Sequence, residues 1–232
     1  MPINYAHRRQ QFLDALEGQA AVIPAAALMQ HHADVEFPFR QDSDFWYLTG
    51  FDEPGAVALF LPHRPDSSFV LFVPAKDPTA EVWHGFRWGT EGAVAEFGAD
   101  VAHPLEQLDA LLPDYLQGAE GICFRVGRHP KLEKLVLRCW ADQLDRAART
   151  GEAVRQLTAP CPILHGMRLR KDAAELDRLR QACRISAEAH ERVRALVQPG
   201  QNEAEVRANL EQHFLASGSR GFAYPSIVAG GD

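Results

Sequence analysis

The chain has 232 residues, of which 46% are hydrophobic and 24% are charged, with a formal net charge of −7 at pH 7. This composition is typical of a folded protein with one large domain or two smaller ones. The acidic balance argues against nucleic acid or an anionic membrane as the partner, because both select a cationic surface. No apolar run reaches the roughly 20 residues that span a bilayer.

The number and spacing of the cysteines indicate which structural sites to expect. The chain contains no CxxC pair among its four cysteines, Cys123, Cys139, Cys161 and Cys183. We therefore expect neither a thiolate zinc site nor a disulfide framework. The N-terminus also lacks the apolar segment of a signal peptide. Reduced, mostly buried thiols in a cytoplasmic protein are the expectation.

The first part of the chain alternates strand-like and helix-like segments. An amphipathic N-terminal helix places Phe12 and Leu16 on one face. Helical spacing of apolar residues predicts helices over 104–116 and over Lys131 to Arg149. Runs rich in Val, Leu and Phe, bounded by Pro, Gly and Asp, predict strands over 20–26, 45–51, 56–62, 69–74, 81–86 and 121–127. This pattern predicts an α/β fold with a mixed sheet over about the first 150 residues.

The pattern changes after a proline-containing segment, 158–172, which we interpret as a linker with one strand or short helix. Asp172 with Glu175 predicts a capping box and the start of a long helix. Pro199 and Gly200 end that helix, and Asn202 with Glu205 starts another. A strand around Tyr224 follows. Two helices and one strand are too few to bury a core, so this stretch resembles the beginning of a domain.

Common catalytic motifs are missing. The sequence has no GxSxG, GxxxxGK[ST], GxGxxG or HExxH, and His190 within its helix is interpreted as a helix-face histidine. His32, Asp34 and Glu36 would share one face of an extended segment, as three possible metal ligands at a spacing of two. The alternative is a solvated loop before a buried strand. A hard-metal site needs ligands from several segments, and no second acidic segment is evident.

Charged and aromatic residues adjoin one another in two places. Arg40, Asp42 and Asp44 precede the aromatic run 45–47 and are either an ion pair at a strand edge or the rim of a ligand or subunit contact. Trp83 and Trp88 either line a pocket or seal a core. Tyr224 is by default a core tyrosine, with contact to substrate as the alternative.

Three segments together resemble bacterial Xaa-Pro aminopeptidases, also called aminopeptidase P. They are "EFPFRQDSDFWYLTGFDEPGAVALFLP", "TAEVWHGFRWG", and "HGMRLRKDAAELDRLRQAC" through "AYPSIVAGGD". The resemblance implies an N-terminal α/β domain over residues 1–165, of the creatinase and aminopeptidase P type. It implies an incomplete α+β "pita-bread" metallopeptidase domain over 166–232.

The same resemblance implies two divalent metal ions, usually manganese, held by two Asp, one His and two Glu. In the family these ligands lie C-terminal to the stretch matching "YPSIVAGGD", and so does the catalytic histidine. We therefore expect no metal ligand and no catalytic residue in this chain. Asp232 is not expected to be the first ligand, and the chain alone is expected to be inactive.

The resemblance carries over four substrate-binding positions, Tyr224, Asp34, Arg40 and Trp83. It implies a peptide with proline in second position as substrate. It also implies a homo-oligomer, a dimer or tetramer, or association with the missing C-terminal part. Two alternatives stay open: a non-catalytic assembly or regulatory module, and a prolidase-like or creatinase-like relative.

Overall fold

The computed structural model describes residues 2–151, 154 and 156–230. Contacts divide the chain into two compact units, Asn4–Leu169 and a second unit of Met1–Ile3 with Arg170–Asp232. We call them the N-terminal unit and the C-terminal unit. The boundary predicted at residue 165 falls inside a helix of the N-terminal unit, Cys161–Leu169. The assignment of domains stays a prediction, since contacts define packing and not domain ancestry.

The N-terminal unit is built on a six-stranded mixed sheet with the order β6-β5-β4-β1-β7-β8. Only β4 runs against its two neighbours, and the other adjacent strands pair in parallel. A separate antiparallel hairpin joins β2 to β3. The strands are β1 (Ala20–Pro24), β2 (Gln30–His32), β3 (Val35–Glu36), β4 (Val57–Phe60), β5 (Phe69–Val73), β6 (Val101–Pro104), β7 (Ile122–Phe124) and β8 (Leu157–Thr158).

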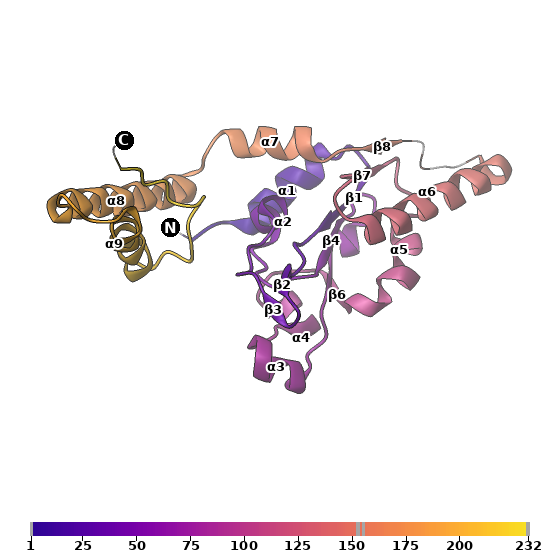
Figure 1. Cartoon of the computed structure of the whole chain (residues 1–232). Coiled ribbons are helices and arrows are strands. Elements are labelled where there is room, and N and C mark those ends of the chain that lie inside the picture. Colours follow the sequence, from indigo (N-terminus) through magenta and orange to yellow (C-terminus); the bar gives the residue numbers. More distant parts are fainter. Residues whose placement is uncertain (1, 152–153, 155, 231–232) are drawn as a thin grey trace. The chain divides into compact units, whose positions relative to one another are not determined.

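Helices cover both faces of this sheet, as Figure 1 shows for α1 and α2 on one side and α5 and α6 on the other. Alternate residues of each central strand enter different cores, so that Ile23 joins the core with α1 and α2 while Val22 joins the core with α5 and α6. The helices are α1 (Tyr5–Ala15), α2 (Ser43–Thr49), α3 (Pro78–His84), α4 (Gly89–Ala95), α5 (Leu108–Leu116), α6 (Pro130–Thr150) and α7 (Cys161–Leu169), with 3₁₀ turns at Pro65–Ser67 and Leu105–Gln107. The α/β fold with a mixed sheet is confirmed.

Two predicted strands are wrong, because local capping makes them helices. In the segment 45–51, the Asp42 carboxylate accepts the Asp44 and Phe45 N–H groups, and Gly50 ends α2 with φ 67°. In 81–86, Asp77 caps α3 and Gly85 ends it with φ 81°. Their aromatic residues favour strands on propensity alone, and these caps outweigh that preference.

A hydrogen-bonded group of polar residues fixes the loops beside this sheet. The Gln41 carboxamide accepts the N–H groups of Ala26 and Asp42, both at 2.8 Å. It donates to the carbonyls of Phe51 at 3.1 Å and Glu53 at 2.9 Å. One side chain thus joins the end of β1 to the start of α2 and to the segment before β4. The hairpin β2–β3 lies between the joined ends.

The C-terminal unit consists mainly of α8 (Ala173–Leu196) and α9 (Glu203–Ala216), which pack on each other. The predicted capping box is present, with Asp172 and Glu175 each accepting the other's backbone N–H. Asn202 caps α9 by accepting the Ala204 N–H. The predicted strand around Tyr224 is wrong, since 222–230 forms no strand and the described part of this unit offers none to pair with it. Within the described ranges, no helix is long and apolar enough to cross a membrane.

Two half-buried histidines of the N-terminal unit contact one tyrosine. The His63 ring pairs with the Tyr115 carbonyl at 3.1 Å, and the His103 ring pairs with the Tyr115 hydroxyl at 2.8 Å. Burial lowers the pKa of both imidazoles below 6.5, and neighbouring Arg64 lowers that of His63 further. Folding therefore favours the neutral forms of both rings.

Replacing the Gln41 carboxamide should destabilise the protein. Gln41→Leu leaves four backbone groups without their partner, and we expect the free energy of unfolding to fall by roughly 2–4 kcal/mol in urea titrations. Gln41→Glu keeps the acceptor and loses the donor, so its effect should be smaller. The matched control is Gln10→Leu, because Gln10 is exposed and, among the described residues, its side chain bonds to Asp14 alone. This variant should change stability by less than about 0.5 kcal/mol. Equal falls in the free energy of unfolding for Gln41→Leu and Gln10→Leu would contradict a stabilising role of the Gln41 hydrogen bonds.

Stability should also fall as the pH drops below 6.5. The unfolded chain binds protons at His63 and His103 more readily than the folded chain, so their contribution is complete above the unfolded pKa and is lost as the pH falls. The raised pKa of Glu53 acts in the opposite direction. The test therefore compares wild type with His63→Gln/His103→Gln by denaturant titration at about pH 7.5 and about pH 5.5. The double variant should lose less stability than wild type between the two pH values. Equal losses in the two proteins would contradict the assignment of this pH dependence to His63 and His103.

Candidate functional site

Asp34 lies at the turn of an exposed hairpin. Strand β2 pairs Gln30 with Glu36 and His32 with Val35, which leaves Ala33, with φ 41°, and Asp34 in the turn. The three possible metal ligands of the sequence, His32, Asp34 and Glu36, therefore do not share one extended face. That arrangement is wrong because the chain reverses between the first residue and the third.

Aromatic and backbone contacts close the base of the hairpin. The Phe37 N–H donates to the Met29 carbonyl at 2.9 Å, and the rings of His31 and Phe37 meet edge to face at 4.7 Å. Arg40 follows in the exposed segment that leads to Gln41. The four hydrogen bonds of Gln41 thus fix the segment that carries both Asp34 and Arg40.

Charges before α2 resolve into a structural ion pair. Asp44 pairs with Arg168 of α7, and the Tyr47 hydroxyl donates to the Met167 carbonyl at 3.5 Å. These contacts join α2 to α7 on one face of the sheet. For Asp44, these contacts therefore favour the structural ion pair over the rim of a ligand or subunit contact.

The two tryptophans of the second aromatic run have different environments. Trp83 on α3 is 83% exposed, and Val82 beside it is 79% exposed. Trp88 is half-buried and packs edge to face on Phe97 at 5.3 Å. Only Trp88 seals a core. An exposed tryptophan is uncommon, because burying its ring removes a large apolar surface from water.

The polypeptide around α3 is held by contacts of one buried and one half-buried carboxylate that the sequence did not indicate. Glu53 is 7% exposed and accepts the Trp88 N–H at 2.7 Å, while Glu81 accepts the Arg87 N–H at 2.9 Å. Burial raises the pKa of Glu53, and the Trp88 N–H and nearby Arg87 counteract that rise. Glu53 and Gln41 appear in the sequence as ordinary loop residues. Their adjacency to the strand and helix ends is the one signal that distinguishes them.

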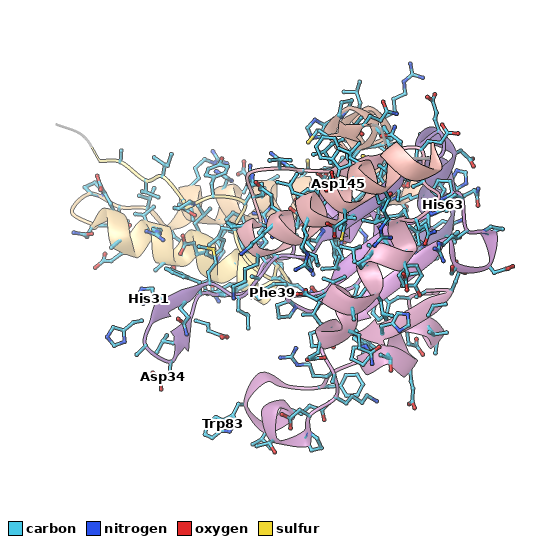
Figure 2. All side chains as sticks on the ribbon, turned by 90° about the vertical axis from the view of Figure 1, so that its right-hand side faces the viewer. His31, Asp34, Phe39, His63, Trp83 and Asp145 are labelled. Atoms are coloured by element: carbon cyan, nitrogen blue, oxygen red, sulfur yellow. The ribbon has the colours of Figure 1, made fainter. Side chains whose placement is uncertain are left out.

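The hairpin and α3 project from the same side of the N-terminal unit in both views, and Figure 2 shows Asp34 and Trp83 pointing away from the sheet. The structure thus places Asp34 and Trp83 on two projections of one unit, and Arg40 in the exposed loop that follows the hairpin. Tyr224 belongs to the C-terminal unit, where it is 71% exposed. Its exposure excludes a core role within that unit as described.

The described residues do not supply a metal site. Across residues 2–151, 154 and 156–230, no group of three or more His, Cys, Asp or Glu side chains is placed to hold an ion. His190 instead bonds through Nδ1 to the Ser186 carbonyl at 2.7 Å, as a helix-face histidine does. Asp232 lies outside the described residues. Metal-dependent chemistry would thus need ligands that these ranges do not place together.

Comparisons with known proteins cover nearly the whole chain. The sequence is 33% identical to the Xaa-Pro aminopeptidase of Escherichia coli K12 over 98% of this chain and 52% of that protein. It is 29% identical to human Xaa-Pro aminopeptidase 3, over 99% of this chain and 47% of that protein. The chain therefore spans about half the length of the curated relatives it matches.

Solved structures give the same result. The structure of aminopeptidase PepP from Pseudomonas aeruginosa has a TM-score of 0.86 and 36% identity, covering 92% of this chain and 49% of that one. Zinc-substituted E. coli aminopeptidase P in complex with product has a TM-score of 0.87 and 32% identity, covering 95% of this chain and 51% of that one.

Two family descriptions divide the sequence. The description "Metallopeptidase family M24", a family that implies divalent metal ions, matches residues 177–232. "Aminopeptidase P, N-terminal domain" matches residues 5–123, which is just over half of the chain. By this match and by the fold that accompanies it, the chain belongs to the aminopeptidase P family.

Proposed function

We propose that this polypeptide is the N-terminal portion of an Xaa-Pro aminopeptidase, an enzyme that releases the first residue from peptides with proline in second position. One observation carries the proposal: similarity to a named Xaa-Pro aminopeptidase extends over 98% of the chain, through both matched families. The activity belongs to a complete enzyme, because the chain spans about half of each of these relatives. Alone, this chain is proposed to be inactive.

Four exposed positions are the proposed contacts with substrate: Asp34, Arg40, Trp83 and Tyr224. The support is physical. Asp34 and Arg40 offer opposite charges in water-accessible positions, which suits the charged terminus and carbonyls of a peptide. Trp83 exposes a large ring that gains free energy by stacking on an apolar side chain or on proline, and Tyr224 exposes a phenol whose hydroxyl can hydrogen-bond to a peptide group.

A homo-oligomer is the proposed assembly, as a dimer or tetramer. The exposed apolar residues on the hairpin and α3 support it, because such a concentration on one side of a unit is typical of a contact surface. Those residues are Met29, Val35, Phe37, Val82, Trp83 and Phe86. Association with a polypeptide that completes the M24 domain is the other partner we propose.

Two divalent ions, with manganese as the proposed metal, belong to the complete enzyme in this proposal. The described residues place no ligand cluster for them, so no step of the reaction is assigned to this chain. A cytoplasmic location is also proposed. It is supported by four free cysteines, of which Cys183 is exposed, as expected in a reducing compartment.

The alternatives are a non-catalytic assembly or regulatory module, and a prolidase-like or creatinase-like relative. The first predicts binding without turnover even when the M24 domain is completed. The second predicts turnover on a different substrate class. A panel of Xaa-Pro peptides, Xaa-Pro dipeptides and creatine, given to the completed enzyme, separates the three.

The 232-residue chain alone should not cleave an Ala-Pro-Pro peptide with added Mn(II). The expectation follows from the missing ligand cluster, since a divalent ion needs several convergent oxygen or nitrogen ligands to be held. Release of free alanine, followed by chromatography, is the measurement, with the complete E. coli relative as positive control. Chelator-sensitive release from a preparation of a single intact mass would overturn the expectation.

Tyr224→Phe in a complete enzyme should reduce substrate use more than stability. Loss of one hydroxyl contact corresponds to a fall in kcat/KM of about tenfold, while the melting temperature should stay within about 2 °C because the side chain is exposed. Tyr115→Phe is the matched control. It loses the bond to His103 and should lower the melting temperature with kcat/KM unchanged. Unchanged kinetics in Tyr224→Phe would remove this residue from the substrate site.

A further inference from the structure

A crevice lies at the carboxyl ends of β1 and β7 in the sheet of the N-terminal unit. These strands are parallel neighbours, pairing Ala20 with Ile122 and Val22 with Phe124. After β1 the chain enters the face covered by α2, and after β7 it enters the opposite face, covered by α6. Figure 1 shows α2 and α6 on opposite sides of this strand pair. Where the chain leaves adjacent parallel strands toward opposite faces, the carboxyl ends form a crevice that binds ligands in many α/β proteins.

A pocket occupies this edge of the sheet. Its empty volume is about 460 Å³, part of which is open to solvent. Its wall includes the last residues of β1, Arg125 directly after β7, and Pro160 two residues after β8. The rest is polar, with Asp42 and Asp44 on one side and Arg128 and His129 before α6. Three parallel strands thus point their carboxyl ends at one pocket.

Cationic groups in the pocket lack partners, whereas its carboxylates have them. Arg125 and Arg128 form no hydrogen bond or ion pair with any residue that the structure describes. Asp44 pairs with Arg168, and Asp42 accepts two N–H groups at 2.9 and 3.0 Å as the cap of α2. The two guanidinium groups are therefore the charged groups of this wall that lack a hydrogen-bonded partner among the described residues, and the Asp42 carboxylate in the same wall offsets part of their charge.

Two further groups of the same loop bear on the charge of the pocket. His129 is half-buried beside Arg125 and Arg128, and its pKa is lowered first by burial and then by the two guanidinium groups, against the influence of Asp42. Its environment thus favours the neutral ring, which can still donate one hydrogen bond. Glu133 is turned to the loop backbone, where it accepts the Gly127 N–H at 2.6 Å.

We propose that this pocket binds a phosphate group, free or carried on a small metabolite such as a nucleotide. Arg125 and Arg128 bind its oxygens through charge-assisted hydrogen bonds, and His129 donates to a third oxygen. Guanidinium groups suit this chemistry because their fixed donors match the oxygens of phosphate. The positive end of the 21-residue helix α6, which begins at Pro130, adds to the field. The proposal is independent of the peptidase assignment.

Binding is tested on the 232-residue chain by isothermal titration calorimetry at constant ionic strength, with inorganic phosphate and adenosine 5′-monophosphate as separate probes. We expect saturable binding of at least one probe. Arg125→Gln and Arg128→Gln should each weaken it by about tenfold, the equivalent of one charge-assisted bond. Tighter binding of the monophosphate identifies a carried phosphate group, and equal binding identifies free phosphate.

The matched control is Arg138→Gln, an exposed arginine of α6 outside the pocket. Its affinity should stay within about twofold of wild type, because screened charges at a distance contribute little. Thermal unfolding checks that each variant is folded. Absence of saturable binding to both probes overturns the proposal, and so does equal weakening by Arg138→Gln and Arg125→Gln. Since no turnover is measured, failure here leaves the peptidase proposal unaffected.

Discussion

The carboxamide of Gln41 is the interaction on which the exposed side of the N-terminal unit depends. Its four hydrogen bonds join the end of β1, the start of α2 and the segment before β4. The last of those segments also supplies Glu53, which holds the turn after α3 through the Trp88 N–H. Two polar side chains therefore set where the hairpin and α3 leave the sheet. Polar anchoring of this kind is directional, whereas apolar packing alone would let the two projections shift.

Burial of the sheet on both faces explains why polar anchors are confined to its edges. Strands β1, β4 and β5 are apolar at nearly every position, because each successive side chain enters one of two cores. No room is left on those strands for charged groups. Charged side chains accumulate instead where strands end, as Asp42, Arg125 and Arg128 do at the carboxyl edge. The same constraint thus produces a rigid support and a polar rim.

Much of this fold could be predicted from the sequence, and the exceptions share a physical cause. Strands such as β4 and β5 have long apolar runs that suit a doubly covered sheet, and the capping box at Asp172 and Glu175 is a local signal that needs no partner. The aromatic residues of segments 45–51 and 81–86 predict strands, whereas the caps Asp42 and Asp77 start helices there. The role of Gln41 and the pocket at the carboxyl ends of β1 and β7 both depend on contacts between residues that are distant in sequence. No periodicity encodes such contacts. Residue patterns therefore left Asp34, Arg40, Trp83 and Tyr224 with alternative roles, and only the resemblance implied that all four contact substrate.

Specificity and catalysis have different structural requirements, and the chain meets them unequally. A substrate contact needs only one exposed side chain on a firm support, which Trp83 has through α3 and the bonds of Glu53 and Glu81. A divalent metal centre needs several ligands that converge from separate strands, each with its own second partner. The proposed substrate contacts are of the first kind, and the described residues place no group of ligands of the second kind. Under the proposed function, recognition would therefore draw on exposed side chains of this chain, whereas ion binding would need ligands that its described residues do not bring together.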